Sequence, residues 1–526
     1  MQPQTPDMIA LFAVYAQKTG SLTENPVAEP AIHRRYVRLL ADRPAFVLAI
    51  ILFVHAVVWT VLPTVLYPNL PLDLIEALTY GREWQLGYDK LPPLPWWAIE
   101  IVWRTVGHDF AYYLLAQIAV VIALWLVWLT ARPLIGATGA LIAVFIIDGL
   151  HYFNFTAAKF NHDVVQLPFW ALAGYAYHRA LRGGSLVHWS LLGLAIGCSL
   201  WAKYFVVVLA APLVLFLLID RDARKHLATP GPYVAAALGL IVMTPHLVWL
   251  VQNDFLPFAY AEHRAAPSRG MIDHIWHPVY FALGQLFFAL PLLLIAGALV
   301  YPRDKAPAVA FRADAFDRRI VTLLAFGPFA TVILLSLVTG RGAIAMWGYP
   351  LWLFLGVFVV LAARRALDER RVWRVSVTWA GVFAVFALAF LASYGVMPRF
   401  DHRYRAVFFP GDTLAAEVTR GFRAATGQPL RYVISDMFDG GNIAHYSSDQ
   451  PRVLIDGKPE RTPWISLPDM KKSGAVVLWE GADLSTIPAE YKDIAGGAVV
   501  QPPLKLKHRS GDGILNAGWA ILKPQP

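Results

Sequence analysis

The stretch from Leu66 to Trp103 reads LYPNLPLDLIEALTYGREWQLGYDKLPPLPWWAIEIVW and follows the first long apolar run of the chain. It carries too many charged residues to cross a membrane. Asp73 and Glu76 have helical spacing, so both carboxylates can share one polar face while apolar neighbours touch the membrane. After Lys90 three prolines keep the chain stiff, and Pro95 can begin a second short helix. The stretch therefore predicts two short helices and a rigid turn at a membrane surface, held in place by the rest of the chain.

The composition predicts a polytopic membrane protein. Hydrophobic residues make up 57% of the 526 residues and charged residues only 15%, whereas a soluble protein has about 25% charged residues. Cys198 is the single cysteine, which excludes disulfides, thiolate zinc sites and cysteine catalysis within one chain. The net charge of +9 would suggest nucleic acid for a soluble domain. In a membrane protein the placement of charge matters more, and we expect no nucleic-acid partner.

Apolar runs long enough to cross about 30 Å of hydrocarbon predict eleven transmembrane helices. The runs at 186–201 and 204–220 are short and meet at Lys203, so they form either two spans or a re-entrant pair. The eleven predicted spans lie at 45–66, 110–130, 137–153, 163–181, 186–201, 204–220, 232–252, 278–300, 320–339, 347–363 and 375–395.

Basic residues are concentrated in alternate loops, with the densest groups at 301–319 and 364–374. This asymmetry is the positive-inside pattern. It predicts that residues 1–44 are a cytoplasmic segment before an uncleaved first span, and that residues 45–397 form a transmembrane catalytic domain. The Leu66–Trp103 stretch then faces outward, which is the periplasm in a cell with two membranes.

Residues 398–526 have the composition of a soluble domain, predicted to lie outside the membrane. Short runs typical of β-strands occur at 430–435, 452–455 and 474–479, and residues 412–426 have helical spacing. The sequence Asp-Gly-Gly-Asn at 439–442 is typical of an ordinary turn. We expect a small α/β domain that covers the outer face of the helical bundle.

Several short motifs are similar to those of bacterial glycosyltransferase family 39, a membrane-embedded class of GT-C type that includes aminoarabinose transferases and protein O-mannosyltransferases. The resemblance covers roughly residues 45–350 and implies eleven to thirteen spans with two juxtamembrane helices in the first outer loop. It also implies a polyprenyl-phosphate sugar donor and inversion at the anomeric carbon. The motifs are GYDKLPPLP at 87–95, KFNHD at 159–163, AKY at 202–204, PH at 245–246 and ND at 253–254.

The resemblance also implies roles for single residues. Asp73 is similar to the catalytic acid of the family, and Lys90 to a lysine beside the donor phosphate, although Leu91 separates Lys90 from the Pro-Pro pair. Four further residues match the positions at which members of this family contact the donor phosphate or bind a divalent metal ion. The phosphate contacts are Arg264 and Tyr349, and the metal ligands are Asp89 and His263.

Transfer from a lipid phosphate needs a base for the acceptor hydroxyl and cations for the departing phosphate. Asp73 can act as the base if burial raises its pKa, although it could instead cap a surface helix. Glu76, one turn later, is expected to orient the site. Lys90 and Lys203 can stabilise negative charge on the phosphate, the alternative being contact with lipid headgroups.

A second polar cluster, Lys159, Asn161, His162 and Asp163, precedes a span, and Asp163 could cap that helix. Together these residues predict an inverting glycosyltransferase that moves one sugar to a hydroxyl acceptor at the outer face of the inner membrane. The acceptor is lipid A or core sugar, another envelope glycan or lipid, or a protein. The alternative is a lipid or glycan transporter, but transporters place polar residues and helix breaks at mid-span, whereas here they lie in outer loops.

Overall fold

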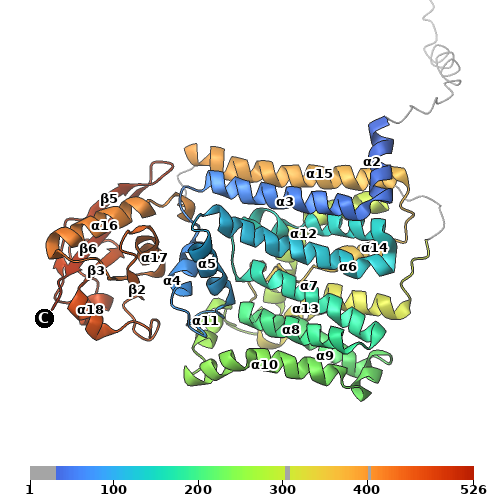
Figure 1. The fold of residues 1–526 in the computed structure, drawn as a ribbon, viewed down its shortest axis with the longest axis horizontal. Helices are drawn as coiled ribbons and strands as arrows, with labels where there is room; N and C mark the ends of the chain where they lie inside the picture. The colour runs from blue at the N-terminus through green and yellow to red at the C-terminus, as the bar shows by residue number, and fades with distance from the viewer. Residues whose placement is uncertain (1–30, 302–308, 401–403, 526) are drawn as a thin grey trace, which may run out of the picture.

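The computed structural model describes residues 31–301, 309–400 and 404–525, without the side chains of residues 31–34 and His263. A bundle of long helices carries a smaller α/β domain at one end, and two short helices, α4 and α5, lie between them (Figure 1). The helices of the bundle and of this junction are α2 (Ala31–Asp42), α3 (Pro44–Leu66), α4 (Leu72–Gly81), α5 (Leu94–Thr105), α6 (Phe110–Asp148), α7 (His162–Gly183), α8 (Leu186–Ala202), α9 (Val207–Ile219), α10 (Gly231–Gln252), α11 (Leu256–Arg264), α12 (Asp273–Val300), α13 (Ala315–Thr339), α14 (Leu355–Ala363) and α15 (Glu369–Leu391).

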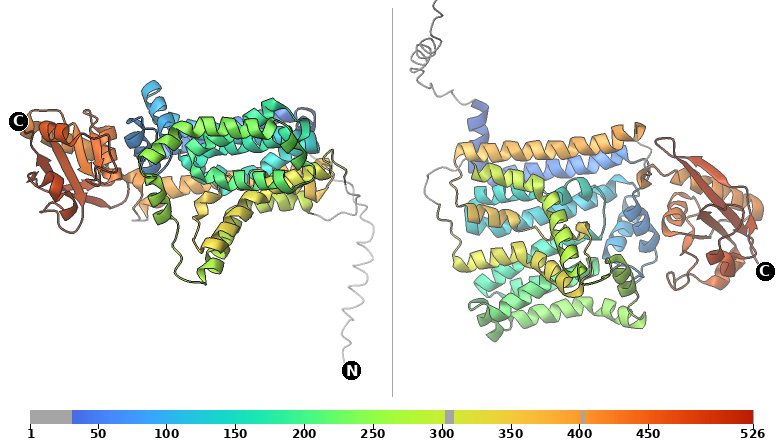
Figure 2. Two further views of the ribbon diagram at one scale, coloured as in Figure 1. Left: turned by 90° about the horizontal axis from the view of Figure 1, so that it is seen from below. Right: turned by 180° about the vertical axis from the view of Figure 1, so that it is seen from behind.

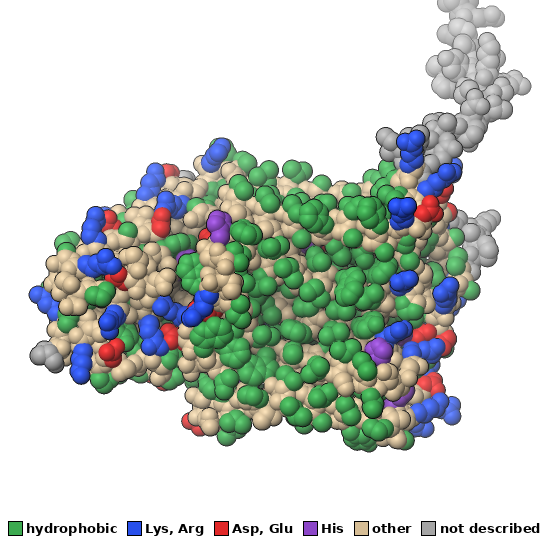
Figure 3. All heavy atoms as spheres, in the orientation of Figure 1, with side chains coloured by type: hydrophobic (Ala, Val, Ile, Leu, Met, Phe, Trp, Pro, Cys, Tyr) green, Lys and Arg blue, Asp and Glu red, His purple; other side chains and the backbone are tan. Residues whose placement is uncertain are grey.

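The bundle is that of a multi-pass membrane protein, as the sequence predicts. Among the described residues, six helices are long and apolar enough to cross a membrane: α3, α6, α10, α12, α13 and α15 with the turns that follow it. On the face seen in Figure 3, apolar side chains cover most of the bundle, and charged side chains lie at its right end and over the C-terminal domain on the left. Large apolar residues such as Phe53 and Phe287 are more than 65% exposed, which lipid contact explains.

The two predicted spans at 110–130 and 137–153 fall on one helix, α6, with a break inside it. A straight helix of 39 residues would be about 58 Å long, twice the hydrocarbon thickness. The break is at Gly136, whose φ of 75° and ψ of 168° are accessible to glycine and strained for other residues. The other predicted spans fall on α3, α7, α8, α9, α10, α12, α13 and α15, whereas the span predicted at 347–363 forms the helix α14 only from Leu355 to Ala363.

The short pair α8 and α9 are separate helices joined at Lys203, and α8 packs along α7 and α10. Figure 2 shows from two further directions that the long helices run side by side and that the α/β domain stays at one end. The predicted N-terminal segment 1–44 lies largely outside the described residues, which begin at residue 31.

The C-terminal α/β domain contains one mixed sheet of order β2-β1-β3-β6-β4, with β5 also paired to β6. Strands β2 and β3 run parallel to β1, and β6 runs antiparallel to β3. The three strands predicted from the sequence are therefore adjacent in the sheet. Its elements are α16 (Gly411–Thr426), β1 (Tyr432–Ser435), α17 (Met437–Tyr446), β2 (Arg452–Ile455), α18 (Leu467–Ser473), β3 (Ala475–Glu480), α19 (Ala489–Ala495), β4 (Val499–Val500), β5 (Leu504–Lys507) and β6 (Ile514–Leu522).

The predicted turn at 439–442 is wrong, because these residues lie inside helix α17. Asp436 caps this helix, since its side chain accepts hydrogen bonds from the backbone N–H groups of Phe438 and Asp439. The glycines serve packing instead of a turn. A Cβ atom on Gly441 would lie 2.5 Å from Oγ1 of Thr79 in α4, so glycine lets α17 touch α4.

This contact also corrects the expected surroundings of α4. Of the apolar neighbours expected to touch the membrane, Leu72 is exposed, whereas Ile75 and Leu78 are buried, since α17 packs on α4. On its other side α4 contacts α5 closely. A Cβ atom on Gly81 would lie 2.3 Å from the carbonyl oxygen of Trp96. Helix α4 is therefore fixed between α5 and the C-terminal domain.

Candidate active site

A cavity of about 450 Å³ lies where the segment between α3 and α6 meets the bundle. Its lining combines apolar side chains, such as Phe205, Met346 and Trp347, with charged side chains from α4 and from two further segments of the chain. This combination suits a ligand with an apolar tail and an anionic head. Nine of the twelve candidate residues predicted from the sequence line the cavity: Asp73, Glu76, Lys90, Lys159, Asn161, His162, Asp163, Lys203 and Arg264.

Asp73, in the first turn of α4, is held by two residues from the loop before α7. Nζ of Lys159 lies 3.3 Å from Oδ2 of Asp73, and Nδ2 of Asn161 donates to the same oxygen at 3.2 Å. Oδ1 of Asn161 accepts from the backbone N–H groups of Asp163 and Val164. Asn161, and not Asp163, therefore caps α7, which leaves the carboxylate of Asp163 for the cavity.

Glu76 pairs with Lys90 across the cavity wall. Nζ of Lys90 lies 2.5 Å from Oε1 of Glu76 and 5.6 Å from the ring centre of Tyr260, a distance at which a cation and an aromatic ring attract each other. The prolines after Lys90 are anchored as well, because Nε2 of His162 donates to the carbonyl of Pro92 at 3.1 Å. The backbone after Lys90 is therefore anchored, and the ammonium group of Lys90 is paired with Glu76.

A third pair joins Lys203 to Asp163, with 2.5 Å between Nζ and Oδ1. Gln166 also donates to this oxygen, at 3.2 Å. Nζ of Lys203 lies within about 6 Å of the rings of Phe205 and Trp347. The cavity thus contains three pairs of one lysine and one carboxylate, and each pair joins different segments of the chain.

The pKa values of the two acids on α4 are shifted in opposite directions. Burial disfavours the charge on Asp73, but Lys159 and the hydrogen bond from Asn161 outweigh it, so the pKa of Asp73 is lowered. Burial raises the pKa of Glu76, and its partner Lys90 offsets only part of that rise. The expected rise for Asp73 is therefore wrong, because Lys159 is 86 residues away in the sequence and in contact in the fold.

Of the two further residues predicted to contact the donor phosphate, Arg264 lines the cavity and Tyr349 does not. Arg264, at the end of α11, lines the cavity and makes no ion pair with any residue of the described ranges. Tyr349 is wholly buried, with its ring centre 4.7 Å from that of Tyr152. The structure does not place Tyr349 among the lining residues, and its phosphate contact stays a prediction.

Asp89 is engaged by the C-terminal domain. Nε of Arg461 donates to Oδ2 of Asp89 at 2.6 Å, and the Tyr80 hydroxyl donates to Oδ1 at 2.8 Å. With both oxygens bound to donors and a guanidinium beside them, Asp89 does not fit a metal ligand in this arrangement. The side chain of His263 lies outside the described part of the structure. In the described ranges no three His, Cys, Asp or Glu side chains gather as a metal site, and the metal ion stays a prediction.

Comparison with known proteins finds similar sequences among glycosyltransferases. Residues 90–249 match the family described as dolichyl-phosphate-mannose-protein mannosyltransferase. The predicted resemblance to membrane glycosyltransferases is confirmed. The chain is 24% identical to the lipopolysaccharide core galacturonosyltransferase RgtA of Rhizobium johnstonii over 515 residues, which cover 92% of the chain and 99% of the relative. It is 26% identical to RgtB, of the same description and organism, over 79% of the chain and 87% of the relative. These relatives confirm the prediction of an enzyme of the glycosyltransferase class.

The fold is also that of a solved structure. ArnT from Cupriavidus metallidurans in the apo state has a TM-score of 0.60 with 14% identity, covering 92% of this chain and all of that one. ArnT bound to undecaprenyl phosphate has a TM-score of 0.58 with 12% identity, covering 91% and 99%. The predicted fold class, a GT-C helical membrane protein with a small C-terminal α/β domain, is confirmed.

Sequence reasoning missed three residues of this region. Tyr260 and Trp347 lie beside the lysines of the cavity, and Arg461 holds the residue next to Lys90. Their contacts join segments from about 140 to more than 370 residues apart. The sequence carries no local pattern that marks any of the three, so only the fold reveals them.

Proposed function

We propose that the protein is an inverting glycosyltransferase that moves one sugar from a polyprenyl phosphate to a hydroxyl group of an envelope glycolipid at the outer face of the inner membrane. The observation that carries this proposal is a cavity that combines three lysine–carboxylate pairs with apolar side chains in one lining. The fold shared with ArnT, which was solved with undecaprenyl phosphate, supports the choice of donor.

The cations of the cavity suit the departing phosphate. Lys90, Lys159, Lys203 and Arg264 outnumber the three carboxylates by one, so the site keeps a positive charge for the donor headgroup. Negative charge on the phosphate increases as its bond to the sugar breaks. Cations already in place stabilise that charge without rearrangement. The apolar wall formed by Phe205, Met346 and their neighbours accommodates the start of the lipid chain.

Asp73 is the proposed base. The acceptor hydroxyl attacks the anomeric carbon from the side opposite the phosphate, and the carbon–oxygen bond to the phosphate breaks with its electron pair leaving on the phosphate. Asp73 takes the hydroxyl proton. Its lowered pKa keeps it ionised at neutral pH. A donor phosphate that draws Lys159 away from Asp73 would raise the pKa of Asp73 and so strengthen it as a base.

The relatives guide the choice of sugar and acceptor. RgtA and RgtB are described as lipopolysaccharide core galacturonosyltransferases, and a third relative, RgtD, as a lipid A galacturonosyltransferase. Galacturonic acid is therefore the first sugar to test, with lipid A or its core as the first acceptor. The alternative, transport without chemistry, leaves the paired acids and lysines of the cavity without a role.

The proposal is tested by mass spectrometry of envelope glycolipids from wild-type cells, deletion cells, and deletion cells that carry either the wild-type gene or the Asp73→Asn variant. We expect one hexuronic acid mass to be absent from the deletion and the variant, and restored by the wild-type gene. If the missing mass is that of another sugar, the protein is still a glycosyltransferase, but its donor carries that sugar instead of a hexuronic acid. Identical glycolipids in all four strains would contradict the transferase.

A further inference from the structure

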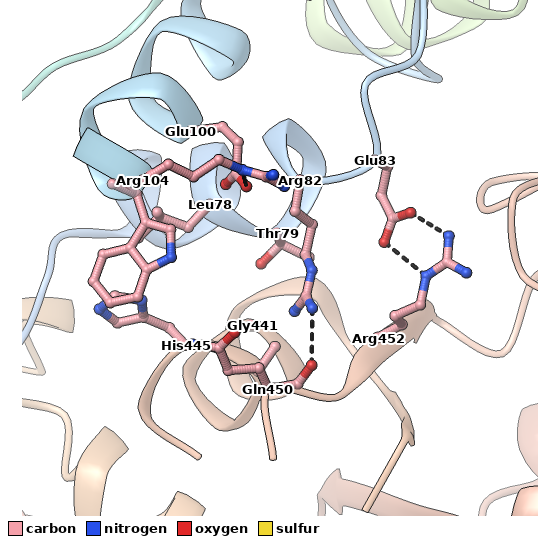
Figure 4. A pocket seen from close by; sticks show the side chains of 12 residues that line it. Leu78, Thr79, Arg82, Glu83, Glu100, Arg104, Gly441, His445, Gln450 and Arg452 are labelled. Atoms are coloured by element: carbon pink, nitrogen blue, oxygen red, sulfur yellow. Dashed lines mark hydrogen bonds and ion pairs between the residues drawn. The ribbon is translucent and has the colours of Figure 1, made fainter. Parts of the chain in front are cut away.

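A second cavity, of about 480 Å³, lies on the opposite side of α4 from the active site, between the juxtamembrane helices and the C-terminal domain. Its wall is built from α4, α5, α17 and the segment that leads into β2 (Figure 4). The volume is within the range of about 300–1,000 Å³ for small-molecule sites. None of the residues assigned to the proposed reaction lines this cavity.

Three guanidinium groups and two carboxylates line the cavity. Arg452 is bound to Glu83 by two hydrogen bonds, and Arg104 donates to Glu100 at 2.7 Å. Arg82 has no such partner. It donates only to the backbone carbonyls of Gln450 at 2.9 Å and Pro451 at 3.1 Å, and no carboxylate of the described residues forms an ion pair with it. The cavity therefore has one positive charge that the protein does not neutralise.

The position of Arg82 makes this charge available to a ligand. Burial lowers the pKa of Arg82, because a guanidinium is less stable as a cation away from water. A carboxylate or phosphate monoester that enters the cavity would restore the lost solvation through charge-assisted hydrogen bonds. The five N–H donors of an arginine allow it to keep its carbonyl contacts and still bind such a group.

Aromatic side chains form the next part of the wall. The rings of Trp103 and His445 lie edge to face, with 5.1 Å between their centres. Burial lowers the pKa of His445 to about 4, so the imidazole is neutral at pH 7 and contributes a flat surface instead of a charge. A guanidinium next to flat rings suits a small ligand that has both a negative group and an apolar face, which describes a sugar acid.

We propose that this cavity binds an anionic sugar residue of the acceptor glycan, carrying a carboxylate or a phosphate. The link to the acceptor rests on the proposed function. Asp73 and Arg82 are at opposite ends of α4, and nine residues of helix separate them by about 14 Å. An acceptor oligosaccharide held at Arg82 can therefore extend around α4 and present a hydroxyl near Asp73. The cavity at Arg82, called the outer cavity from here on, would then select the acceptor, while the cavity at Asp73 and Lys90, called the inner cavity, holds the donor.

Binding is tested on the full-length protein in detergent with two probes of similar size, methyl β-glucuronide and methyl β-glucoside. We expect the wild type to bind the glucuronide about tenfold or more tightly than the neutral glucoside, as measured by calorimetry. Arg82→Gln should remove this preference, since a charged hydrogen bond accounts for a difference of that size. Lys505→Gln removes the same charge from the exposed β5, at the opposite edge of the sheet from β2, and should leave the preference unchanged.

Glu100→Gln should change the affinity for the glucuronide in the opposite direction to Arg82→Gln. Glu100 is buried and paired with Arg104, so its replacement removes a negative charge from the cavity, leaves Arg104 without this partner, and should tighten glucuronide binding several-fold. A purely structural role of Arg82 and Glu100 predicts loss of stability in both variants and no change in the ratio of the two affinities. Equal binding of the two sugars by the wild type, or a preference that Arg82→Gln retains, would overturn the proposal. If Arg82→Gln does not fold, the direction of the Glu100→Gln effect decides.

Activity measurements separate this proposal from the transferase itself. Arg82→Gln should raise the KM for the acceptor about tenfold and leave kcat and binding of the lipid-phosphate donor within a few-fold of the wild type. A mannose phosphate in place of the glucuronide distinguishes a phosphate from a carboxylate as the preferred group. Selective glucuronide binding by a protein that transfers no sugar would sustain the cavity and refute the transferase. Sugar transfer by Arg82→Gln with an unchanged KM for the acceptor would support the transferase and refute the role of this cavity in acceptor binding.

Discussion

The two cavities on either side of α4 differ in how their charges are arranged. In the inner cavity each carboxylate has a lysine partner, and the lysines are compact charges on flexible stems that can move from a carboxylate to an incoming phosphate. In the outer cavity the positive charges are guanidiniums, and Arg82 is tied to backbone carbonyls in a fixed orientation. The first arrangement suits a site where charge changes during a reaction, and the second suits recognition of a group that does not change.

The largest expected effect is that of Asp73→Asn, which keeps the shape of the side chain but cannot accept a proton. Positioned bases contribute about 10²- to 10⁴-fold, so the single-turnover rate should fall by that factor while donor affinity stays within a few-fold. Binding of methyl β-glucuronide to the outer cavity should not change. Transfer near the wild-type rate would move the base to Glu76 or Asp163.

The next effect in size concerns Lys90→Met, which removes one cation of the inner cavity. A charged hydrogen bond contributes about 1.5–3 kcal/mol, so binding of undecaprenyl phosphate should weaken by about 10- to 100-fold in a detergent binding assay. Lys90→Arg should restore part of this loss, because charge is kept and geometry is not. Unchanged donor affinity in Lys90→Met would remove this lysine from the phosphate site.

A smaller effect is expected for Gly441→Ala, which acts on the contact between α17 and α4. The new Cβ atom would lie 2.5 Å from Thr79 and 2.6 Å from Ile75, and overpacking of this kind costs about 1–3 kcal/mol. The thermal unfolding midpoint should fall, and glucuronide binding should weaken more than donor binding. Gly497→Ala is the control, because nothing lies within 4 Å of an added Cβ atom there. Equal stability of the two variants would show that α17 and α4 are not tightly packed.

The smallest effect is expected for Lys159→Met, in which the fall of kcat/KM at acid pH should begin at a higher pH than in the wild type. Because the pKa of Asp73 is lowered, the free enzyme should keep the base ionised, and kcat/KM should stay constant between pH 7 and about pH 5. Lys159→Met removes the main group that lowers this pKa and leaves burial unopposed. The pKa of Asp73 should then rise, and the acid limb should move to higher pH. A profile that does not move would place another group in the role of base.

The sequence predicted the inner cavity better than the outer one for a physical reason. The candidates of the inner cavity lie in short motifs that precede or follow apolar spans, and membrane topology alone brings together the ends of those spans that lie on one membrane face. Nine of twelve candidates line one cavity for that reason. The partners within it were not predictable, because the choice of Lys159 for Asp73 and of Lys90 for Glu76 depends on distances of a few ångströms.

The outer cavity could not be predicted because it depends on the packing of two domains. Arg82 and its carbonyl partners at 450 and 451 are more than 360 residues apart, and no apolar pattern in either segment indicates the other. The helix α17 at 437–446 was likewise missed, since its two glycines are typical of a turn and the cap at Asp436 precedes them. Local patterns predicted the strands on either side, where β-branched residues and turn residues alternate.

The contact between Arg461 and Asp89 has a consequence for the order in which the enzyme is made. Asp89 is the residue before Lys90, and its partner follows 372 residues later. At about 5–20 residues per second, the ribosome needs roughly 20 to 75 s to travel from one to the other. During that interval the bundle can insert into the membrane while the loop with Lys90 still lacks its last support. The nascent enzyme therefore inserts into the membrane before the C-terminal domain has been made, and that domain later supplies Arg461, which holds the loop beside the active site.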